Sequence, residues 1–171
     1  PWDYNLSFST HGMHSARDAI NYPIDTVFSG VSGEDRPLVG KLLEVPEYRE
    51  RYRSYLEKIA VEYVDSGLFA QTVDTLNGEI EDYVREDATT FSTFEAYQAG
   101  IEALKLFGQL RSQSVLGQLE GSVPSTQEEQ AGSENLVDAS ALDLSALGSM
   151  GMGGGFPGRM PQAPDGLPAE E

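Results

Sequence analysis

The sequence contains no cysteine, so the chain has no disulfide, no thiolate zinc site and no iron–sulfur cluster. It also lacks an uninterrupted apolar run of about 18 residues, and we therefore expect no membrane-spanning helix in it. Basic residues are scarce, because 11 Lys and Arg stand against 28 Asp and Glu and the formal net charge is −17. Since nucleic-acid affinity comes mainly from cationic side chains that neutralise phosphates, this balance argues against a nucleic-acid partner.

Familiar catalytic motifs are absent as well. The sequence has no Walker-type phosphate loop, no nucleophile elbow and no Ser–His–Asp set. The glycine run at Gly151–Gly155 lacks the preceding strand and the following helix that a phosphate cradle needs. His11 and His14 have no third zinc ligand at a matching spacing, so an exposed loop is the simpler interpretation of that segment.

Residues 122–171 differ in composition from the rest of the chain. They include eight glycines, five prolines and a single aromatic residue, Phe156, with eight acidic residues against one basic residue. Such a segment buries too little apolar surface to offset the entropy of ordering. We therefore predict that residues 122–171 form a disordered acidic, Gly/Pro/Met-rich tail. A short amphipathic helix around Leu136–Leu147 is the alternative for that part of it.

Between residues 35 and 121 the apolar residues recur at helical spacing. Asp35 can cap a first helix that has Pro37 in its opening turn and Leu38, Leu42 and Leu43 as its buried stripe. Further helices are expected from Pro46 to about Asp65, over 69–84 and from a Ser92–Glu95 capping box to Phe107, with a last turn through Val115–Leu119 that ends at Gly121. The tyrosines at 48, 52, 55 and 63 follow the same spacing, which indicates helix packing rather than a ligand cage.

The first residues have a different pattern. Trp2–Phe8 alternates polar and apolar residues and is rich in aromatics, which is typical of a short strand. The following residues, Ser9–Gly33, read as a loop, and Tyr22–Pro23 should keep its Asn-Tyr-Pro-Ile-Asp turn extended. Because a single strand cannot satisfy its own backbone groups, we expect a partner strand upstream of Pro1.

Two groups of polar residues are candidates for a role in chemistry. Asp3 and Asn5 lie two residues apart on the expected strand, so both side chains point to one face. Oxygen ligands suit Mg²⁺, which proteins usually hold through one or two carboxylates together with substrate phosphates. A surface strand with two polar residues is the alternative. A solvated acidic cluster that could attract a basic substrate comprises Glu79, Glu81, Asp82, Glu86 and Asp87.

Several segments together resemble the spore coat protein H (CotH) kinase family. The most specific are the Pro-Trp-Asp-Tyr-Asn-Leu-Ser-Phe run at Pro1–Phe8 and the Asn-Tyr-Pro-Ile-Asp turn at Asn21–Asp25. Weaker similarity is found at Arg36–Leu38, Tyr48–Tyr52, Phe91–Phe94, Arg111–Val115 and Gln118–Leu119. The resemblance covers about residues 1–121, which we therefore expect to form one unit of such a kinase.

This resemblance implies an α+β, atypical protein-kinase-like fold with two lobes. The present chain would be the mostly helical portion of the C-terminal lobe, with one N-terminal strand. The resemblance also implies phosphate transfer from ATP, with Mg²⁺, to Ser or Thr of a coat or surface protein, in the spore coat, in the cell envelope or outside the cell. Asp3 would be the metal ligand that binds Mg-ATP, and Asn5 its helper.

The sequence also departs from what such a kinase needs. The ATP-covering loop, the phosphate-pairing lysine and the catalytic-base aspartate would all precede Pro1, and the usual glycine-containing continuation is replaced by Ser9–Gly12. Lys41, Lys58 and Lys105 fall on the expected C-terminal helices and do not fill the gap. We therefore expect this chain to be inactive alone and to need an upstream lobe of the same protein. The alternative is a helical, acidic binding or surface-attachment module without catalysis.

Overall fold

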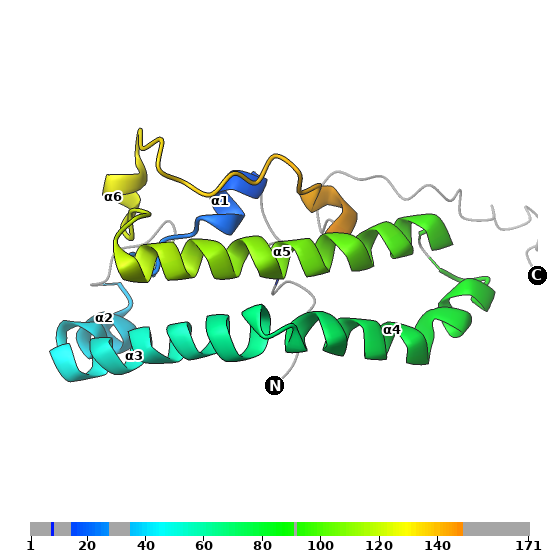
Figure 1. Cartoon of the computed structure of the whole chain (residues 1–171), viewed down its shortest axis with the longest axis horizontal. Coiled ribbons are helices and arrows are strands. Elements are labelled where there is room, and N and C mark those ends of the chain that lie inside the picture. Colours follow the sequence, from blue (N-terminus) through cyan, green and yellow to red (C-terminus); the bar gives the residue numbers. More distant parts are fainter. Residues whose placement is uncertain (1–7, 9–14, 28–34, 91, 149–171) are drawn as a thin grey trace, which may run out of the picture.

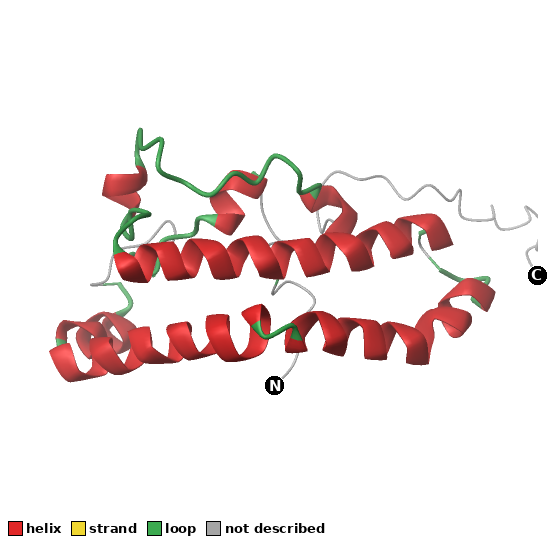
Figure 2. Ribbon diagram, in the orientation of Figure 1, coloured by secondary structure: helices red, strands yellow, loops and turns green. Residues whose placement is uncertain are grey.

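The computed structural model describes Phe8 and residues 15–27, 35–90 and 92–148. All regular structure in these ranges is helical, as Figure 2 shows. The elements are α1 (Ala16–Ile20), α2 (Pro37–Glu44), α3 (Pro46–Lys58), the π-helix η2 (Ile59–Asp65), α4 (Leu68–Glu86), α5 (Phe94–Glu120), α6 (Gln127–Gln130) and the 3-10 helix η3 (Leu144–Leu147). The mostly helical character is thus confirmed. The predicted strand lies outside the described residues except for Phe8, which is in a turn.

The long helix α5 organises the molecule. The elements α3, η2 and α4 follow one another in a layer along one side of α5, which runs back in the opposite direction (Figure 1). On the other side lie α1 and residues 122–148, and η3 covers the first half of α5 (Figure 1). Because α5 is covered from both sides, it supplies many of the buried side chains, including Ala103, Phe107 and Val115.

Proline and glycine set most of the helix ends, as the sequence predicts. Pro37 and Pro46 open α2 and α3, and Gly67 and Gly121, both with a φ of 85°, precede α4 and end α5. This left-handed backbone favours glycine because it has no Cβ. The N-cap of α5 is Thr93, one residue later than predicted, and α5 continues without the break expected after Phe107.

The loop predicted for Ser9–Gly33 contains a helix. Ser15 caps α1 by accepting a hydrogen bond from the backbone nitrogen of Asp18 at 3.1 Å, and Ala19 and Ile20 are buried in the core. A helix of five residues offers too few positions for a 3.6-residue period to stand out. The two buried side chains, rather than local propensity, hold it in place.

The prediction of a disordered tail is wrong for residues 122–148. Val123, Ala139 and Leu142 are buried, and Ala139 and Leu142 join the core cluster that contains Phe107. Composition was a poor guide because it does not report the buried apolar side chains and the hydrogen bonds to distant residues that stabilise this segment. Of the helix considered for Leu136–Leu147, only the 3-10 turn of η3 is present. Residues 149–171 lie outside the described part.

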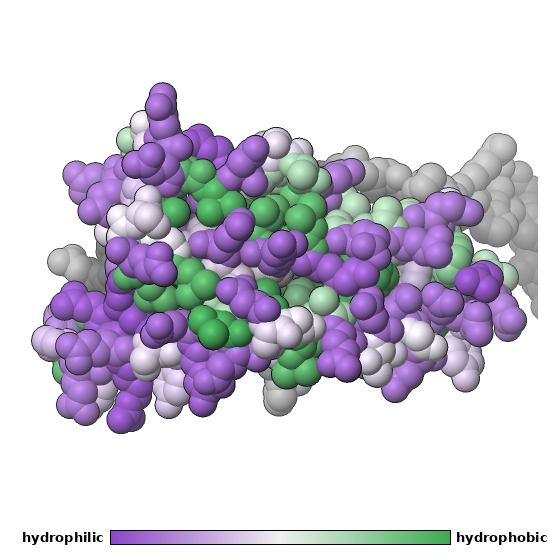
Figure 3. All heavy atoms as spheres, viewed as in Figure 1, coloured by the Kyte–Doolittle hydropathy of each residue, from purple (hydrophilic) through white to green (hydrophobic). Residues whose placement is uncertain are grey.

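Two of the three residues predicted as the buried stripe of α2 are exposed, and the third, Leu43, is only half-buried. Leu38 is 76% exposed and Leu42 is 45% exposed, and no residue of α2 is buried. The N-cap residue of α2 is Arg36, one residue after the expected Asp35, and the Arg36 side chain makes no capping hydrogen bond. Large apolar side chains also remain accessible on α3, η2 and α4, among them Tyr48, Tyr55, Ile59, Tyr63, Leu76, Ile80 and Tyr83. On the face seen in Figure 3, apolar side chains reach the surface in patches between polar ones.

Candidate functional site

The residues predicted to hold a metal, Asp3 and Asn5, lie outside the described residues, as do His11 and His14. From the segment of Asp3 the structure places only Phe8. The Phe8 ring meets the Phe107 ring edge-on, with the centroids 5.8 Å apart and the planes at 89°. This is a favoured arrangement of two aromatic rings, and it attaches the end of the segment to the middle of α5.

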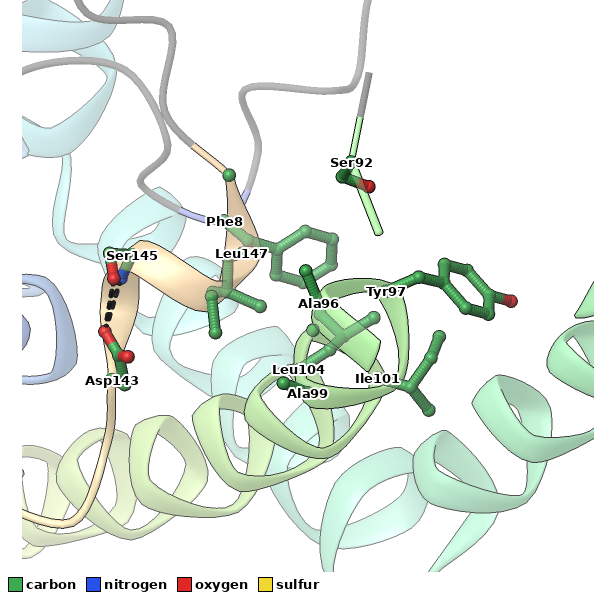
Figure 4. Close-up of a pocket in the computed structure, with 13 residues that line it drawn as sticks. Phe8, Ser92, Ala96, Tyr97, Ala99, Ile101, Leu104, Asp143, Ser145 and Leu147 are labelled. Atoms are coloured by element: carbon green, nitrogen blue, oxygen red, sulfur yellow. Dashed lines mark hydrogen bonds between the residues drawn. The ribbon is translucent and has the colours of Figure 1, made fainter. Parts of the chain in front are cut away.

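Two apolar cavities border Phe8. The larger, of about 650 Å³, lies between the first half of α5 and η3, where Ile101, Leu104 and Leu147 contribute apolar walls (Figure 4). The smaller, of about 330 Å³, lies between α5 and the layer of α3, η2 and α4. Among the described lining residues, Phe8 is the only one shared by both cavities.

The Asn-Tyr-Pro-Ile-Asp turn forms a buried polar junction. Asn21 is 1% exposed, and its side-chain nitrogen donates to the backbone oxygens of Arg17 at 2.9 Å and Val137 at 3.0 Å. Its side-chain oxygen accepts from Val137 N at 2.9 Å and from the Ser114 hydroxyl at 3.2 Å. All four of these hydrogen bonds of the Asn21 side chain therefore join α1, α5 and the segment after α6.

From α5, Gln118 continues this junction. Its side-chain oxygen accepts from the backbone nitrogen of Ile24 at 2.9 Å, and its nitrogen donates to Ser114 Oγ at 3.0 Å and to the Tyr22 carbonyl at 3.3 Å. Ile24, Ser114 and Gln118 are all at most 1% exposed. Buried amides with every partner in place fix a backbone firmly, since each broken bond would leave a desolvated polar group.

Arg111 holds the same turn through its charge. Its Nη1 donates to the carbonyl oxygens of Ile20 at 2.8 Å and Tyr22 at 2.7 Å. Burial lowers the pKa of its guanidinium, and the nearby Tyr52 and Tyr22 oppose that shift. The guanidinium therefore acts as a clamp on two backbone carbonyls.

The other end of the turn is attached to α3. Arg53 Nη1 pairs with Asp25 Oδ2 at 2.7 Å, and the Tyr52 hydroxyl donates to the carbonyl of Ile24 at 3.1 Å. Burial raises the pKa of Tyr52, an effect that the nearby Arg111 opposes. One short turn thus connects α3, α5 and the segment that follows α5.

A second polar pair lies where the π-helix ends. The Ser112 hydroxyl, on the buried face of α5, contacts Asp65 Oδ1 at 2.6 Å and the carbonyl of Ala60 at 3.3 Å. A π-helix leaves carbonyls that the α-helical pattern would satisfy, and π-helical turns occur often at functional sites. Ser112 supplies a hydrogen-bond donor at this point.

The charged residues singled out in the sequence have ordinary structural partners. Lys105 joins α5 to α4 through Asp74 at 2.9 Å and pairs with Glu102 at 2.7 Å, and these hydrogen bonds, Glu102 first, raise the pKa of its amine. In the acidic cluster, Arg85 lies 3.7 Å from Glu81 and 3.4 Å from Asp82. Within the described ranges no three His, Cys, Asp or Glu side chains are grouped so as to hold a metal ion.

A comparison with family models decides the family. The model described as CotH kinase protein matches residues 1–115. The chain belongs to the CotH kinase family. The CotH match includes the Asp3 segment and the Asn21–Asp25 turn, and it ends inside α5. No curated protein and no solved structure matches the chain.

The junction residues of α5 were not identified from the sequence as a set. Arg111, Ser114 and Gln118 are three and four residues apart, so they share one face of the helix. The available signal was the three- and four-residue spacing of these polar residues, which places them on one face of α5. The structure also shows no membrane-crossing helix in its described part.

Proposed function

We propose that this member of the CotH kinase family is the C-terminal portion of an atypical protein kinase that transfers phosphate from ATP to Ser or Thr. The observation that supports this most is the family match, which begins at residue 1 and includes Asp3 and Asn5. In the proposed function, Asp3 is the metal ligand through which Mg-ATP is held, and Asn5 assists it. The protein substrate belongs to the coat or the cell surface.

The donor chemistry fits the metal. A carboxylate and an amide oxygen are ligands that Mg²⁺ accepts, and nucleotide phosphates and water complete its shell. The described residues offer no competing group of three potential ligands. Phosphoryl transfer depends on positioning and on neutralising phosphate charge, and the metal supplies the second.

The described helices supply a framework for positioning. The Asn21–Asp25 turn is held by α3, α5 and residues 122–148, and Phe8 is held by Phe107 of α5. Rigid elements position a site more accurately than isolated loops do. The phosphate-pairing lysine and the catalytic base are assigned to an upstream lobe of the same protein, since Lys105 is committed to Asp74 and Glu102.

The test is Asp3→Ala in the native full-length protein that contains this chain. We expect loss of detectable phosphate transfer from radiolabelled ATP to a coat or surface protein, together with an unchanged thermal midpoint. Glu57→Ala, which removes an exposed carboxylate on α3, is the matched control and should keep normal activity. Near-normal transfer by the Asp3→Ala protein would refute the proposed function.

A binding or surface-attachment module is the second candidate, and the exposed apolar residues favour it. Leu38 of α2 and Tyr83 of α4 are 76% and 77% exposed. Monomeric proteins rarely leave extended apolar faces in water. A binding module keeps its affinity for a coat or surface protein without ATP and Mg²⁺ and in the Asp3→Ala variant. Loss of binding in both cases would exclude it.

A further inference from the structure

We infer that the cavity between α3 and the residues that follow α5 binds a phosphate group, carried on a phosphorylated serine or threonine of a protein partner. The cavity has a volume of about 490 Å³. Its described lining residues include two arginines of α3, Arg49 and Arg53. Binding requires no phosphate transfer, so the inference goes beyond the proposed function and is tested without ATP.

The cavity is positively charged within an acidic protein. The chain has only 11 Lys and Arg against 28 Asp and Glu, yet two of the arginines line this cavity together with a single carboxylate, that of Asp25. The other described lining residues, Leu43, Tyr52 and Thr126, are uncharged at neutral pH. One net positive charge is left in the cavity, and it attracts an anion.

Arg49 supplies the charge that is available to a ligand. Its side chain is exposed and, within the described part of the chain, makes no hydrogen bond or ion pair. Arg53, one helical turn later, donates from Nη1 to Asp25 Oδ2 at 2.7 Å and from Nη2 to the Leu119 carbonyl at 3.2 Å. These bonds use two of the five N–H donors of a guanidinium, so Arg53 keeps donors for a ligand. Since residues four apart share a face of a helix, both guanidinium groups are on the side of the cavity.

Hydrogen bonds between separate parts of the chain fix the wall opposite Arg49. The Asp25 nitrogen donates to the Ser125 carbonyl at 2.9 Å, and the Gln127 nitrogen donates to Thr26 Oγ1 at 3.1 Å. The ion pair between Arg53 and Asp25 attaches this wall to α3. Much of the cavity is thus in place before an anion binds, which reduces the entropic cost of binding.

A phosphate monoester suits this cavity better than a carboxylate does. It carries nearly two negative charges and three acceptor oxygens, whereas a carboxylate carries one charge and two oxygens. Arginine binds such oxygens in pairs through its planar fork of donors. The cavity volume is in the range of about 300–1,000 Å³ that is typical of sites for small organic ligands, so it accepts the side chain that carries the phosphate as well. Leu43 offers that side chain an apolar contact.

The experiment is a titration of a fluorescent peptide, with one phosphoserine among glycine and alanine residues, with the native full-length protein, followed by fluorescence anisotropy without nucleotide. We expect the phosphopeptide to bind at least about tenfold more tightly than the same peptide with serine or glutamate, and added salt to weaken its binding. Equal affinities for the three peptides would overturn the inference.

Inorganic phosphate, added as a competitor, distinguishes the two sources of the anion. We expect it to bind at least about tenfold more weakly than the phosphopeptide, because it leaves the rest of the cavity empty. An equal affinity for inorganic phosphate would assign the cavity to the free anion and overturn the protein partner. Displacement of the phosphopeptide by a non-hydrolysable ATP analogue would also overturn it, since the cavity would then belong to the nucleotide.

Arg49→Gln and Arg51→Gln are a matched pair of variants. Both remove one exposed arginine charge from α3, but Arg51 is two residues further along, on the other side of the helix, and is not among the described residues that line the cavity. We expect Arg49→Gln to weaken phosphopeptide binding about tenfold and Arg51→Gln to leave it within about twofold of normal. Arg49→Lys keeps the charge without the fork and should give an intermediate affinity. Equal effects of the two glutamine variants, or normal binding by Arg49→Gln, would refute the site.

The inference and the proposed function fail separately. A protein that binds the phosphopeptide through Arg49 but transfers no phosphate supports the inference and counts against the proposed function. A protein that transfers phosphate normally, with equal phosphopeptide affinities in the Arg49→Gln and Arg51→Gln variants, refutes only the inference.

Discussion

Asn21 and Val137 form a reciprocal pair of hydrogen bonds, with the Asn21 amide donating at 3.0 Å to the Val137 carbonyl and accepting at 2.9 Å from the Val137 nitrogen. The side-chain amide of Asn21 thus pairs with the backbone of Val137 through one donor and one acceptor, as another peptide group would. The pair joins a turn inside the CotH match to a segment beyond it. Asn21, 116 positions before Val137, therefore contributes to the order of the segment that contains Val137.

Replacing Asn21 tests this pair. Asn21→Ala leaves both polar groups of Val137 without their partner, and each unsatisfied buried group costs about 1–3 kcal/mol. We expect a loss of about 3 kcal/mol in the free energy of unfolding, and faster amide hydrogen exchange at Val137. The exposed Asn135→Ala is the control and should change stability by less than about 0.5 kcal/mol. Equal stabilities of the two variants would contradict the structure.

The packing of residues 122–148 makes a second prediction. Leu142 is 5% exposed in the cluster that contains Phe107, so Leu142→Ala should destabilise the chain by about 2–4 kcal/mol in urea denaturation. Leu38→Ala, at a position 76% exposed, should have little effect. If Leu142→Ala were as mild as Leu38→Ala, the segment would not belong to the core.

Two helical glycines should respond to alanine with opposite signs. A Cβ on Gly108 would lie 2.3 Å from the ring of Phe69, whereas a Cβ on Gly78 would have nothing within 4 Å. Both replacements gain helix propensity, so Gly78→Ala should stabilise by about 0.5–1 kcal/mol. Gly108→Ala must displace a packed ring and should destabilise by about 1–3 kcal/mol. Thermal melts of both variants would check the contrast.

Stability should fall at high pH in part through Tyr52. Burial raises the pKa of Tyr52 above its ordinary value, so the folded state favours the neutral phenol. This contribution is intact below about pH 10, where an exposed tyrosine ionises, and is lost as the pH rises through the raised pKa. The pKa values of Tyr97, raised mainly by burial, and of Lys105, raised mainly by Glu102, act in the same direction.

Tyr52→Phe separates these contributions. It removes the hydrogen bond to Ile24 and should lower stability by about 1 kcal/mol at neutral pH. It should also reduce the loss of stability between about pH 9 and 11 in denaturation experiments. Tyr83→Phe, at a position 77% exposed, is the control and should keep the normal pH dependence. An unchanged alkaline slope in Tyr52→Phe would show that Tyr52 does not contribute.

The helices from α2 to α5 could be located from the sequence because their signals are local. Pro37 and Pro46 open helices, Gly67 and Gly121 separate or end them, and apolar spacing predicts what lies between. The family could also be predicted, from the Pro1–Phe8 and Asn21–Asp25 segments, because a specific motif needs no knowledge of packing.

What the sequence alone determined, then, is the helical content, most helix ends, the acidic charge and the family. The tertiary structure decided which apolar residues are buried, why α1 forms, and that residues 122–148 are ordered. These outcomes depend on hydrogen bonds such as those from Arg111 to Ile20 and from Asn21 to Val137. The two residues of each pair are 91 and 116 positions apart, respectively. Local periodicity and composition do not report such contacts, because the contacts contribute free energy only once the distant segments have been brought together.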